Sequence, residues 1–505
     1  MKPTLTRREF IKTAGIYTAG AALPGYLLKS HKSAAGKNKQ NFLIIVFDAL
    51  SASNMSLYGY PRKTTPKLEL LAEKAIVYHN HYAGGNFTTP GTASLLTGAF
   101  PWSHQAYILN DKVHKSYAKR SVFHAFDDYQ RIAYTHNPIA NTLLRQFMTG
   151  LDDYIPMRDY FLESNALVDT LFSDDHDIAT VSWNRALKQS DDGFSYSLIF
   201  SQIHDYFKKD KLEKLEKTAS DFPRGLPNYD GIAYFTLDDG INGVVEVLDN
   251  NLQPFLGYFH FLPPHNPFKT RVDFNNIFKD DGYNPPIKPD HIFLGDSSNT
   301  DILKKRRLYD EFILYVDSEF ARLYHLLESD GVLENTYLIL TSDHGEMFER
   351  GILGHMTPSL HQPVINIPLV IFPPGGKSRV DIRTATSAID LLPTLAQITN
   401  KEFPDWLEGN VLPPFSSKTT NETFALQVGN VDKEKKISNA TVMMVKDQYK
   451  LNWYFGYEEL GEKGEMIELY NLQADPDEMN NLYHSKLDVA QSMLKTMKLK
   501  LRGKV

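Results

Sequence analysis

The sequence contains no cysteine among its 505 residues. This absence excludes disulfide bonds, metal sites built on thiolates and a cysteine nucleophile. It does not assign a cellular compartment, because a chain without thiols is compatible with reducing and oxidising surroundings alike.

An excess of positive charge is also missing. The net charge is −7, and residues 1–35 carry six Lys or Arg and one Glu, or +5, so the remainder is near −12. This balance argues against nucleic acid as a partner. It leaves the sign of the substrate open, because a metal site sets its own local field.

A long hydrophobic run is the third missing feature. Residues 13–28 form a short, weakly apolar run that contains Gly and Thr, so a stable membrane span is not expected. The run follows the segment TRREFIK at residues 6–12, which is typical of a twin-arginine signal. We therefore expect residues 1–35 to be a signal peptide, and the protein to be exported to the periplasm or another extracytoplasmic space. Ser33-Ala34-Ala35 offers a cleavage site, and an uncleaved signal would provide membrane contact.

Buried strands are indicated by short apolar runs that end in polar residues. The run at 41–47 ends in Asp48, and the run at 337–342 ends in Asp343-His344. Further runs at 255–262 and 368–372 are separated from these by helical patterns at 65–75 and 309–328. This alternation predicts a largely parallel α/β sheet flanked by helices over residues 40–400, with its ligands at the carboxyl ends of the strands.

Two other regions have a different pattern. Residues 105–245 mix short helical patterns, aromatics and acidic clusters, and we expect them to be an insertion over the active site. Residues 440–454 alternate like antiparallel strands, and a helix is expected from about residue 486. Residues 401–505 are therefore predicted to form a smaller C-terminal α+β subdomain.

Four residues of the predicted sheet edge form a candidate metal site: Asp48, Thr88, Asp343 and His344. Two carboxylates, an imidazole and a hydroxyl suit one divalent ion, and the imidazole favours Zn²⁺ or Mn²⁺ over Ca²⁺ or Mg²⁺. Metal coordination would lower the pKa of the Thr88 hydroxyl and orient it for attack on phosphorus or sulfur. Each of these residue types, taken alone, more often has a structural role. The hypothesis of a metal site rests on the order in which all four occur along the chain.

The motifs around these residues resemble, in order, those of the sulfatase family within the alkaline phosphatase superfamily. The resemblance runs over residues 40–485 and rests on FDAL (47–50), FTTPGTASLLTG (87–98), HFLPPHNPF (260–268), TSDHGE (341–346), GH (354–355), DLLPTL (390–395) and ELYNL (468–472). It implies an alkaline-phosphatase-like fold and a metal site made of Asp48, Thr88, Asp343 and His344. It also implies that His265 and His355 contact the ester oxygens and that one of them protonates the leaving group. His260 is a weaker candidate.

The departures from the family pattern concern the nucleophile and the charges near it. Most sulfatases carry a Cys or Ser that is oxidised to formylglycine, whereas Thr88 would give a ketone, so no formylglycine is expected. Ala49 and Thr92 stand where the family commonly has a second Asp and an Arg. A Thr nucleophile resembles instead the phosphotransferases and phosphodiesterases of the superfamily. No Asp-x-x-x-His motif for a second tight metal is evident.

The sequence therefore predicts a hydrolase or transferase of phosphoesters, acting on a phosphodiester or phospho-headgroup through a covalent Thr88 ester. The substrate would be an ester of a small molecule, a glycan or a lipid headgroup. One alternative is a sulfuric ester hydrolase that works without formylglycine. Another is a non-catalytic family member that only binds a metal and a ligand. The oligomeric state cannot be read from the sequence.

Overall fold

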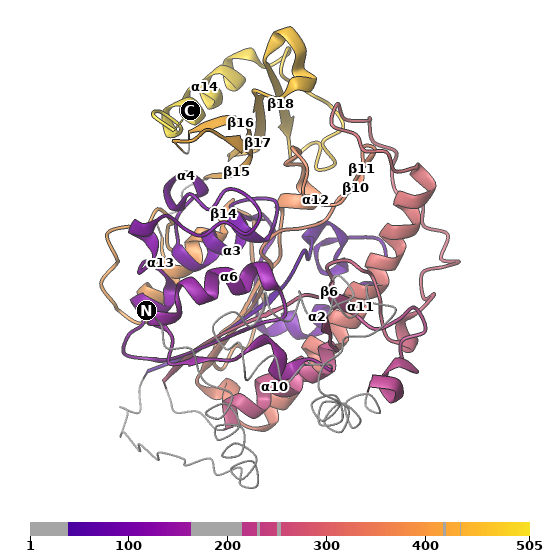
Figure 1. Cartoon of the computed structure of the whole chain (residues 1–505), viewed down its shortest axis with the longest axis vertical. Helices are drawn as coiled ribbons and strands as arrows, with labels where there is room; N and C mark the ends of the chain where they lie inside the picture. The colour runs from indigo at the N-terminus through magenta and orange to yellow at the C-terminus, as the bar shows by residue number, and fades with distance from the viewer. Residues whose placement is uncertain are drawn as a thin grey trace, which may run out of the picture. The chain divides into compact units, whose positions relative to one another are not determined.

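The computed structural model describes residues 39–162, 215–229, 233–249, 254–417, 421–434 and 436–504 (Figure 1). The predicted signal at residues 1–35 lies outside the described residues. Within the described part of the chain, no helix has the length and apolar character that a membrane span requires.

The core is an eight-stranded sheet in which seven strands run in one direction. Only β12 is antiparallel to its two neighbours, β9 and β2. The prediction of a largely parallel sheet is therefore confirmed. The order of the strands is β13 (Val380–Ile382), β2 (Ile76–Tyr78), β12 (Leu369–Phe372), β9 (Thr336–Thr341), β1 (Asn41–Phe47), β8 (Phe255–Phe261), β4 (Gln130–Thr135) and β5 (Asp153–Tyr154).

Helices cover both faces of this sheet, which explains why its central strands are apolar along their whole length. Successive residues of β1 point to opposite faces. Leu43, Ile45 and Phe47 belong to the core under α2 (Pro66–Leu71), α10 (Leu237–Asp249) and α11 (Asn299–Ser329). Phe42 and its alternate neighbours belong to the core under α3 (Thr88–Thr97), α6 (Pro138–Gln146) and α13 (Leu391–Ile398) (Figure 1).

The predicted insertion at 105–245 needs a correction. β4 and β5 lie inside this range, yet β4 pairs with β8 as a parallel strand of the central sheet. The pattern of β4 hid it, because Gln130 and Arg131 at its start are polar and half-buried, and only four residues of the strand are buried. Residues 163–214 of the predicted insertion lie outside the described residues.

Helix α11 is longer than the predicted helix at 309–328. It begins at Asn299, where Ser298 caps it by accepting from the N–H of Asp301. Its first turns are rich in Lys and Arg and carry a weak apolar stripe, so periodicity revealed only the later turns.

The C-terminal part forms a second sheet, as predicted. Four antiparallel strands follow one another in sequence order and pack against α14 (Leu487–Lys500). The N–H of Leu426 in this sheet donates to the carbonyl of Gly84 at 3.0 Å, four residues before Thr88. The C-terminal sheet thus contacts the segment that leads into α3. Its strands are β15 (Glu422–Val431), β16 (Ile437–Lys446), β17 (Tyr449–Phe455) and β18 (Glu465–Asn471).

Candidate active site

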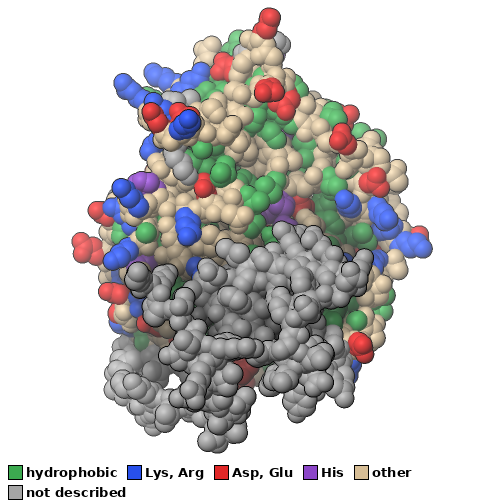
Figure 2. All heavy atoms as spheres, in the orientation of Figure 1, with side chains coloured by type: hydrophobic (Ala, Val, Ile, Leu, Met, Phe, Trp, Pro, Cys, Tyr) green, Lys and Arg blue, Asp and Glu red, His purple; other side chains and the backbone are tan. Residues whose placement is uncertain are grey.

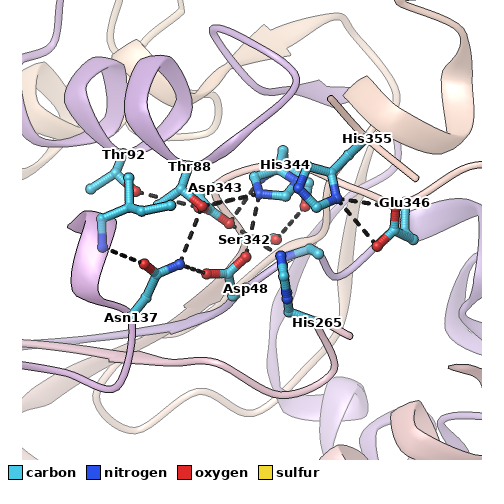
Figure 3. Close-up of polar contacts among 12 residues, drawn as sticks. Asp48, Thr88, Thr92, Asn137, His265, Ser342, Asp343, His344, Glu346 and His355 are labelled. Carbon is cyan, nitrogen blue, oxygen red and sulfur yellow. Dashed lines mark hydrogen bonds and ion pairs between the residues drawn. The ribbon is translucent and has the colours of Figure 1, made fainter. Parts of the chain in front are cut away.

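The carboxyl ends of β1 and β9 place the predicted metal ligands side by side. These strands are parallel neighbours, with Val46 opposite Thr341. Asp48 directly follows β1, and Asp343 and His344 follow β9 after one intervening residue, Ser342. Because parallel strands end at the same edge of a sheet, the side chains converge there (Figure 3).

The four predicted ligands are within reach of one ion. Nε2 of His344 lies 3.3 Å from Oδ1 of Asp48 and 3.6 Å from Oδ2 of Asp343. The ligand atoms of these three buried residues all lie within 4.8 Å of one another. Oγ1 of Thr88 lies 3.4 Å from Nε2 of His344. The hydroxyl of Thr88 is therefore part of the cluster.

Backbone contacts fix the orientation of these side chains. Nδ1 of His344 donates to the carbonyl of Gly345 at 2.9 Å, which leaves Nε2 directed at the carboxylates. Oδ1 of Asp343 accepts from the N–H groups of Ala49 at 3.3 Å and His344 at 3.0 Å. Ala49 has a φ of 59°, a left-handed conformation that is unfavourable for alanine. The contact of its N–H with Asp343 helps to keep Ala49 in this conformation.

The electrostatics of the cluster favour a bound cation. Burial alone would raise the pKa of the Asp48 carboxyl, but its contacts with His260 and His344 hold that pKa well below the ordinary value. Burial opposes protonation of His344, yet Asp343 and Asp48 raise its pKa to about 9. A divalent ion among these groups would meet the carboxylates of both Asp48 and Asp343.

The donor set fits a metal ion. Oδ1 of Asp48 is buried and forms no hydrogen bond with the described residues. Such an oxygen is costly unless something satisfies it, and a divalent cation would do so. Nε2 of His260 lies 3.3 Å from Oδ2 of Asp48 and 3.8 Å from Oδ2 of Asp343. His260, the weaker candidate of the sequence analysis, therefore borders the same centre.

Helix α3 presents Thr88 at its first residue. Phe87 before it is extended, and every residue of the helix is buried. A Cβ atom at Gly91 would lie 2.2 Å from the carbonyl oxygen of Asp343, so only glycine allows the helix to approach β9 so closely. The N-terminus of the helix adds its partial positive charge next to Thr88, which favours an anionic ester there.

Asn137 is a site residue that the sequence analysis missed. It caps α6, with Oδ1 accepting from the N–H of Ile139 at 2.7 Å and of Ala140 at 3.3 Å. This cap fixes the orientation of the amide, so its Nδ2 donates to Oδ2 of Asp48 and, at 3.2 Å, to Oγ1 of Thr88. The Asn-Pro pair at residues 137–138 could have indicated a helix start after a strand, but the sequence did not predict β4.

His265 and His355 lie on the other side of His344 (Figure 3). The ring centre of His355 lies 4.3 Å from that of His344 and 5.0 Å from that of His265. Nδ1 of His355 contacts the Glu346 carboxylate at 3.1 Å, and Nδ1 of His265 donates to the carbonyl of Asn266 at 2.7 Å. These contacts leave the Nε2 atoms of both rings without a hydrogen-bond partner among the described residues, and Glu346 is a second contact that the sequence did not indicate.

Positive side chains are scarce at this centre. No described Lys or Arg forms a hydrogen bond or an ion pair with Asp48, Thr88, Asp343 or His344, whose partners are other residues. Thr92, at the position where sulfatases commonly have Arg, lies with its Oγ1 3.4 Å from Oδ2 of Asp343. Burial lowers the pKa of His355, although Glu346 opposes that shift.

Family profiles match almost all of the described chain. The profile described as Sulfatase matches residues 40–401, and that of the N-sulphoglucosamine sulphohydrolase C-terminal region matches residues 357–504. The chain belongs to the sulfatase family. Members of this superfamily use a metal ion, and the chain has acidic and histidine ligands placed for one.

Curated relatives of this sulfatase-family chain are distant. An uncharacterized sulfatase, YidJ, of Escherichia coli (strain K12) is 24% identical over 74% of this chain and 71% of its own length. Human N-acetylglucosamine-6-sulfatase is 22% identical over 89% of this chain and 82% of its own length. Choline-sulfatase of Rhizobium meliloti (strain 1021) is 26% identical, and the match covers 46% of this chain and 47% of that protein.

Solved structures show the same fold at low identity. Phosphonate monoester hydrolase of Agrobacterium radiobacter superposes with a TM-score of 0.65 and 18% identity, covering 92% of this chain and 96% of that one. BT4656, solved with D-glucosamine-2-N,6-O-disulfate, has a TM-score of 0.63 and 16% identity, covering 92% and 99%. The alkaline-phosphatase-like fold predicted from the motifs is confirmed.

Proposed function

We propose that this chain is an exported, metal-dependent hydrolase or transferase of phosphoesters that acts through a covalent ester of Thr88. The observation that carries the proposal is the position of the Thr88 hydroxyl. It lies at the start of a buried helix, 3.4 Å from Nε2 of His344 and 3.2 Å from Nδ2 of Asn137. No cysteine is present to replace it.

Asp48, Asp343, His344 and Thr88 would hold one divalent ion, Zn²⁺ or Mn²⁺ by preference, with Ca²⁺ and Mg²⁺ as the alternatives. When bound, such an ion lowers the pKa of a coordinated hydroxyl and neutralises charge that develops on the ester. Asn137 would orient Oγ1 of Thr88 by donating to it, and Asp48 would be held by the same amide.

The proposed reaction has two steps. Oγ1 of Thr88 releases its proton to solvent and attacks phosphorus, and the bond from phosphorus to the leaving oxygen breaks. That oxygen takes a proton from His265 or His355. Burial lowers the pKa of His355 and so disfavours its protonated form, although Glu346 opposes that shift. Water or an acceptor alcohol then attacks phosphorus, the bond to Thr88 breaks, and the hydroxyl is restored.

The scarcity of Lys and Arg contacts at the described centre favours a phosphodiester or a phospho-headgroup over a dianionic monoester. The substrate would be a small molecule, a glycan or a lipid headgroup. The alternative of a sulfuric ester hydrolase without formylglycine is favoured by the sulfatase profiles and by the names of the relatives. In that case the Thr88 hydroxyl would attack sulfur directly.

Matched aryl phosphodiesters and aryl sulfates test the two enzymatic possibilities. We expect faster turnover of the phosphodiesters, and loss of turnover by at least about a thousandfold in Thr88→Ala. Thr97→Ala is a matched control, because Thr97 ends the same helix and its hydroxyl bonds only within it, to the carbonyl of Ala93. Faster cleavage of the sulfates would support the alternative. Absence of turnover by metal-loaded wild type would support the non-catalytic possibility.

Metal analysis tests the ligand set. We expect Asp343→Ala to lose the ion of the active site, because it removes one of two carboxylates that lie next to Nε2 of His344. Full metal occupancy of that site in Asp343→Ala would contradict the proposal.

A further inference from the structure

A second buried cluster of ligand-type residues lies apart from the active site. His291 comes from the irregular segment before α11, His361 directly precedes α12 (Gln362–Ile365), and Glu468 lies within β18. Their exposed fractions are 6%, 0% and 8%. Three segments that are distant in the sequence therefore bring two imidazoles and a carboxylate together in the interior.

The distances are those of a metal site. Nε2 of His291 lies 3.4 Å from Oε1 of Glu468, and Nε2 of His361 lies 3.6 Å from Oε2. The ligand atoms of the three residues all lie within 4.8 Å of one another. In a tetrahedral zinc site with bonds of about 2.0–2.1 Å, neighbouring ligand atoms are separated by about 3.3–3.4 Å. The two measured contacts are close to this separation.

Both imidazoles direct an unsatisfied atom into the cluster. Nε2 of His291 and Nε2 of His361 are buried and form no hydrogen bond with the described residues. Leaving such atoms unpaired in the interior is unfavourable. Nδ1 of His361 bonds the hydroxyl of Ser359 at 2.6 Å, an arrangement that leaves Nε2 available as a ligand. A single cation would satisfy both nitrogen atoms.

Hydrogen bonds fix the orientation of the Glu468 carboxylate. Oε2 accepts from the hydroxyl of Tyr454 at 2.7 Å and from Nδ2 of Asn452 at 3.3 Å. Outer hydrogen bonds of this kind orient a metal-binding carboxylate.

Nearby cations are engaged elsewhere. Nζ of Lys450 lies 2.7 Å from Oε1 of Glu478. Nη2 of Arg350 donates to the carbonyl oxygens of Asp477 at 3.1 Å and Glu478 at 2.5 Å. Among the described residues, only His291 and His361 form ion-pair contacts with Glu468.

We propose that His291, His361 and Glu468 form a structural Zn²⁺ site separate from the catalytic metal. His291 must change its tautomer on binding, because its Nδ1 accepts a 3.3 Å hydrogen bond from the N–H of Phe293. Zinc on Nε2 places the proton on Nδ1 and opens that bond. The cost is small, because the bond is long.

The site would connect the C-terminal sheet to the active site. α12 holds the loop after β9, because the N–H groups of Gly345 and Glu346 donate to the carbonyls of Val364 at 2.7 Å and Pro363 at 3.0 Å. Zinc bound between β18 and the start of α12 would fix that support.

Counting zinc in purified protein tests the proposal, with Asp343→Ala used to empty the catalytic site. After zinc loading and dialysis, we expect two equivalents in wild type, one in Asp343→Ala and none in the double variant Asp343→Ala with Glu468→Gln. Glu465→Gln in the Asp343→Ala background is the matched control. It makes the same change of side chain at the exposed first residue of β18, and it should retain one equivalent. If only the catalytic metal site were absent, wild type would hold one equivalent of zinc, and the single variant Glu468→Gln would hold none.

Co²⁺ substitution tests the site without changing its ligands. We expect Asp343→Ala loaded with Co²⁺ to show the visible absorption bands of a tetrahedral nitrogen and oxygen site. We also expect added zinc to raise the Tm of Asp343→Ala but not that of the double variant. Asp343→Ala that binds neither zinc nor Co²⁺ would overturn the proposal, as would a double variant that retains the equivalent.

Discussion

At the scale of single residues, Thr88 is defined by its neighbours. Its hydroxyl lies between an imidazole that borders two carboxylates and an amide that is fixed by a helix cap. Asn137 is the link, because one amide group contacts both the nucleophile and Asp48. We therefore expect Asn137 to be a positioning residue whose effect on catalysis is separable from its effect on α6.

Asn137→Ser separates the two effects. Serine is also a good helix cap, but its hydroxyl is too short to replace Nδ2 at Thr88 and Asp48. We expect kcat to fall by on the order of 10²-fold, the size of effect seen when one positioned donor is removed, while Tm changes little. Asn137→Ala should lower kcat similarly and also reduce stability by about 1 kcal/mol. Equal kcat in Asn137→Ser and wild type would contradict this role.

The sequence predicted the residues that directly follow apolar strands. Asp48, Asp343 and His344 were found because β1 and β9 are unbroken apolar runs, and Thr88 because a Pro and a Gly follow it at a helix start. Asn137 and Glu346 were not found. Asn137 contacts Thr88, which is 49 positions away in the sequence, and Glu346 contacts His355, which is nine positions away. Local sequence patterns do not encode such contacts.

At the scale of elements, the site depends on the close approach of α3 to the end of β9. Gly91 permits that approach, since its hydrogen faces the carbonyl of Asp343 where a Cβ atom would clash at 2.2 Å. The same contact joins the helix of the proposed nucleophile Thr88 to the segment that carries the proposed metal ligands Asp343 and His344. Packing of these two elements therefore sets the geometry of the reacting groups.

Gly91→Ala tests this dependence. We expect the added methyl group to push α3 from β9, to reduce the free energy of unfolding by about 1–3 kcal/mol, and to reduce activity more strongly than stability alone explains. Gly295→Ala is the control, because a Cβ atom there meets only the carbonyl of Gly351 at 3.9 Å. Unchanged activity in a folded Gly91→Ala protein would contradict the account.

The cap that precedes α13 predicts a pH dependence of stability. Burial raises the pKa of Asp390 to about 7, above its ordinary 3.8, although it accepts from the N–H groups of Asn410 and Ser387. The folded protein therefore keeps a proton between roughly pH 4 and 7 that the unfolded chain releases. The contribution of protonated Asp390 to the free energy of unfolding is fully present below about pH 4. It is lost as the pH rises through about 7, by up to about 1.4 kcal/mol per pH unit.

Urea unfolding of wild type and Asp390→Asn from pH 4 to pH 8 measures this effect. We expect the free energy of unfolding of wild type, minus that of Asp390→Asn, to decrease as the pH rises to about 7 and then to level off. A difference that does not vary with pH would contradict it.

The central strands of the fold could be predicted because both faces of the sheet are covered, so that burial leaves a continuous apolar run. β4 was missed because its first two residues are polar, and β12 could not be assigned an antiparallel direction because direction leaves no pattern in a five-residue run. The start of α11 was missed because its first turns carry charges instead of a broad apolar stripe.

At the scale of the whole molecule, the predicted export signal and the catalytic unit are consistent with one another. The twin-arginine route carries folded proteins, which suits an enzyme that takes up its metal before export. Arg7 and Arg8 are the residues on which this expectation rests.

Replacing both arginines with lysine tests the proposed export. We expect the double variant Arg7→Lys, Arg8→Lys to remain in the cytoplasm of a host that has the twin-arginine system, while wild type reaches the periplasm. Cell fractionation with immunoblotting measures this, and Lys12→Arg is a control that leaves the arginine pair intact. Export of the double variant would contradict the proposal.

The central claim is that Thr88 forms a covalent phosphoryl ester. The most direct measurement is mass spectrometry of protein that is quenched in acid during turnover of an aryl phosphodiester and then digested. We predict an added phosphoryl ester on the peptide that contains Thr88, and none in Thr88→Ala. An adduct on another residue, or full turnover by Thr88→Ala, would contradict the account.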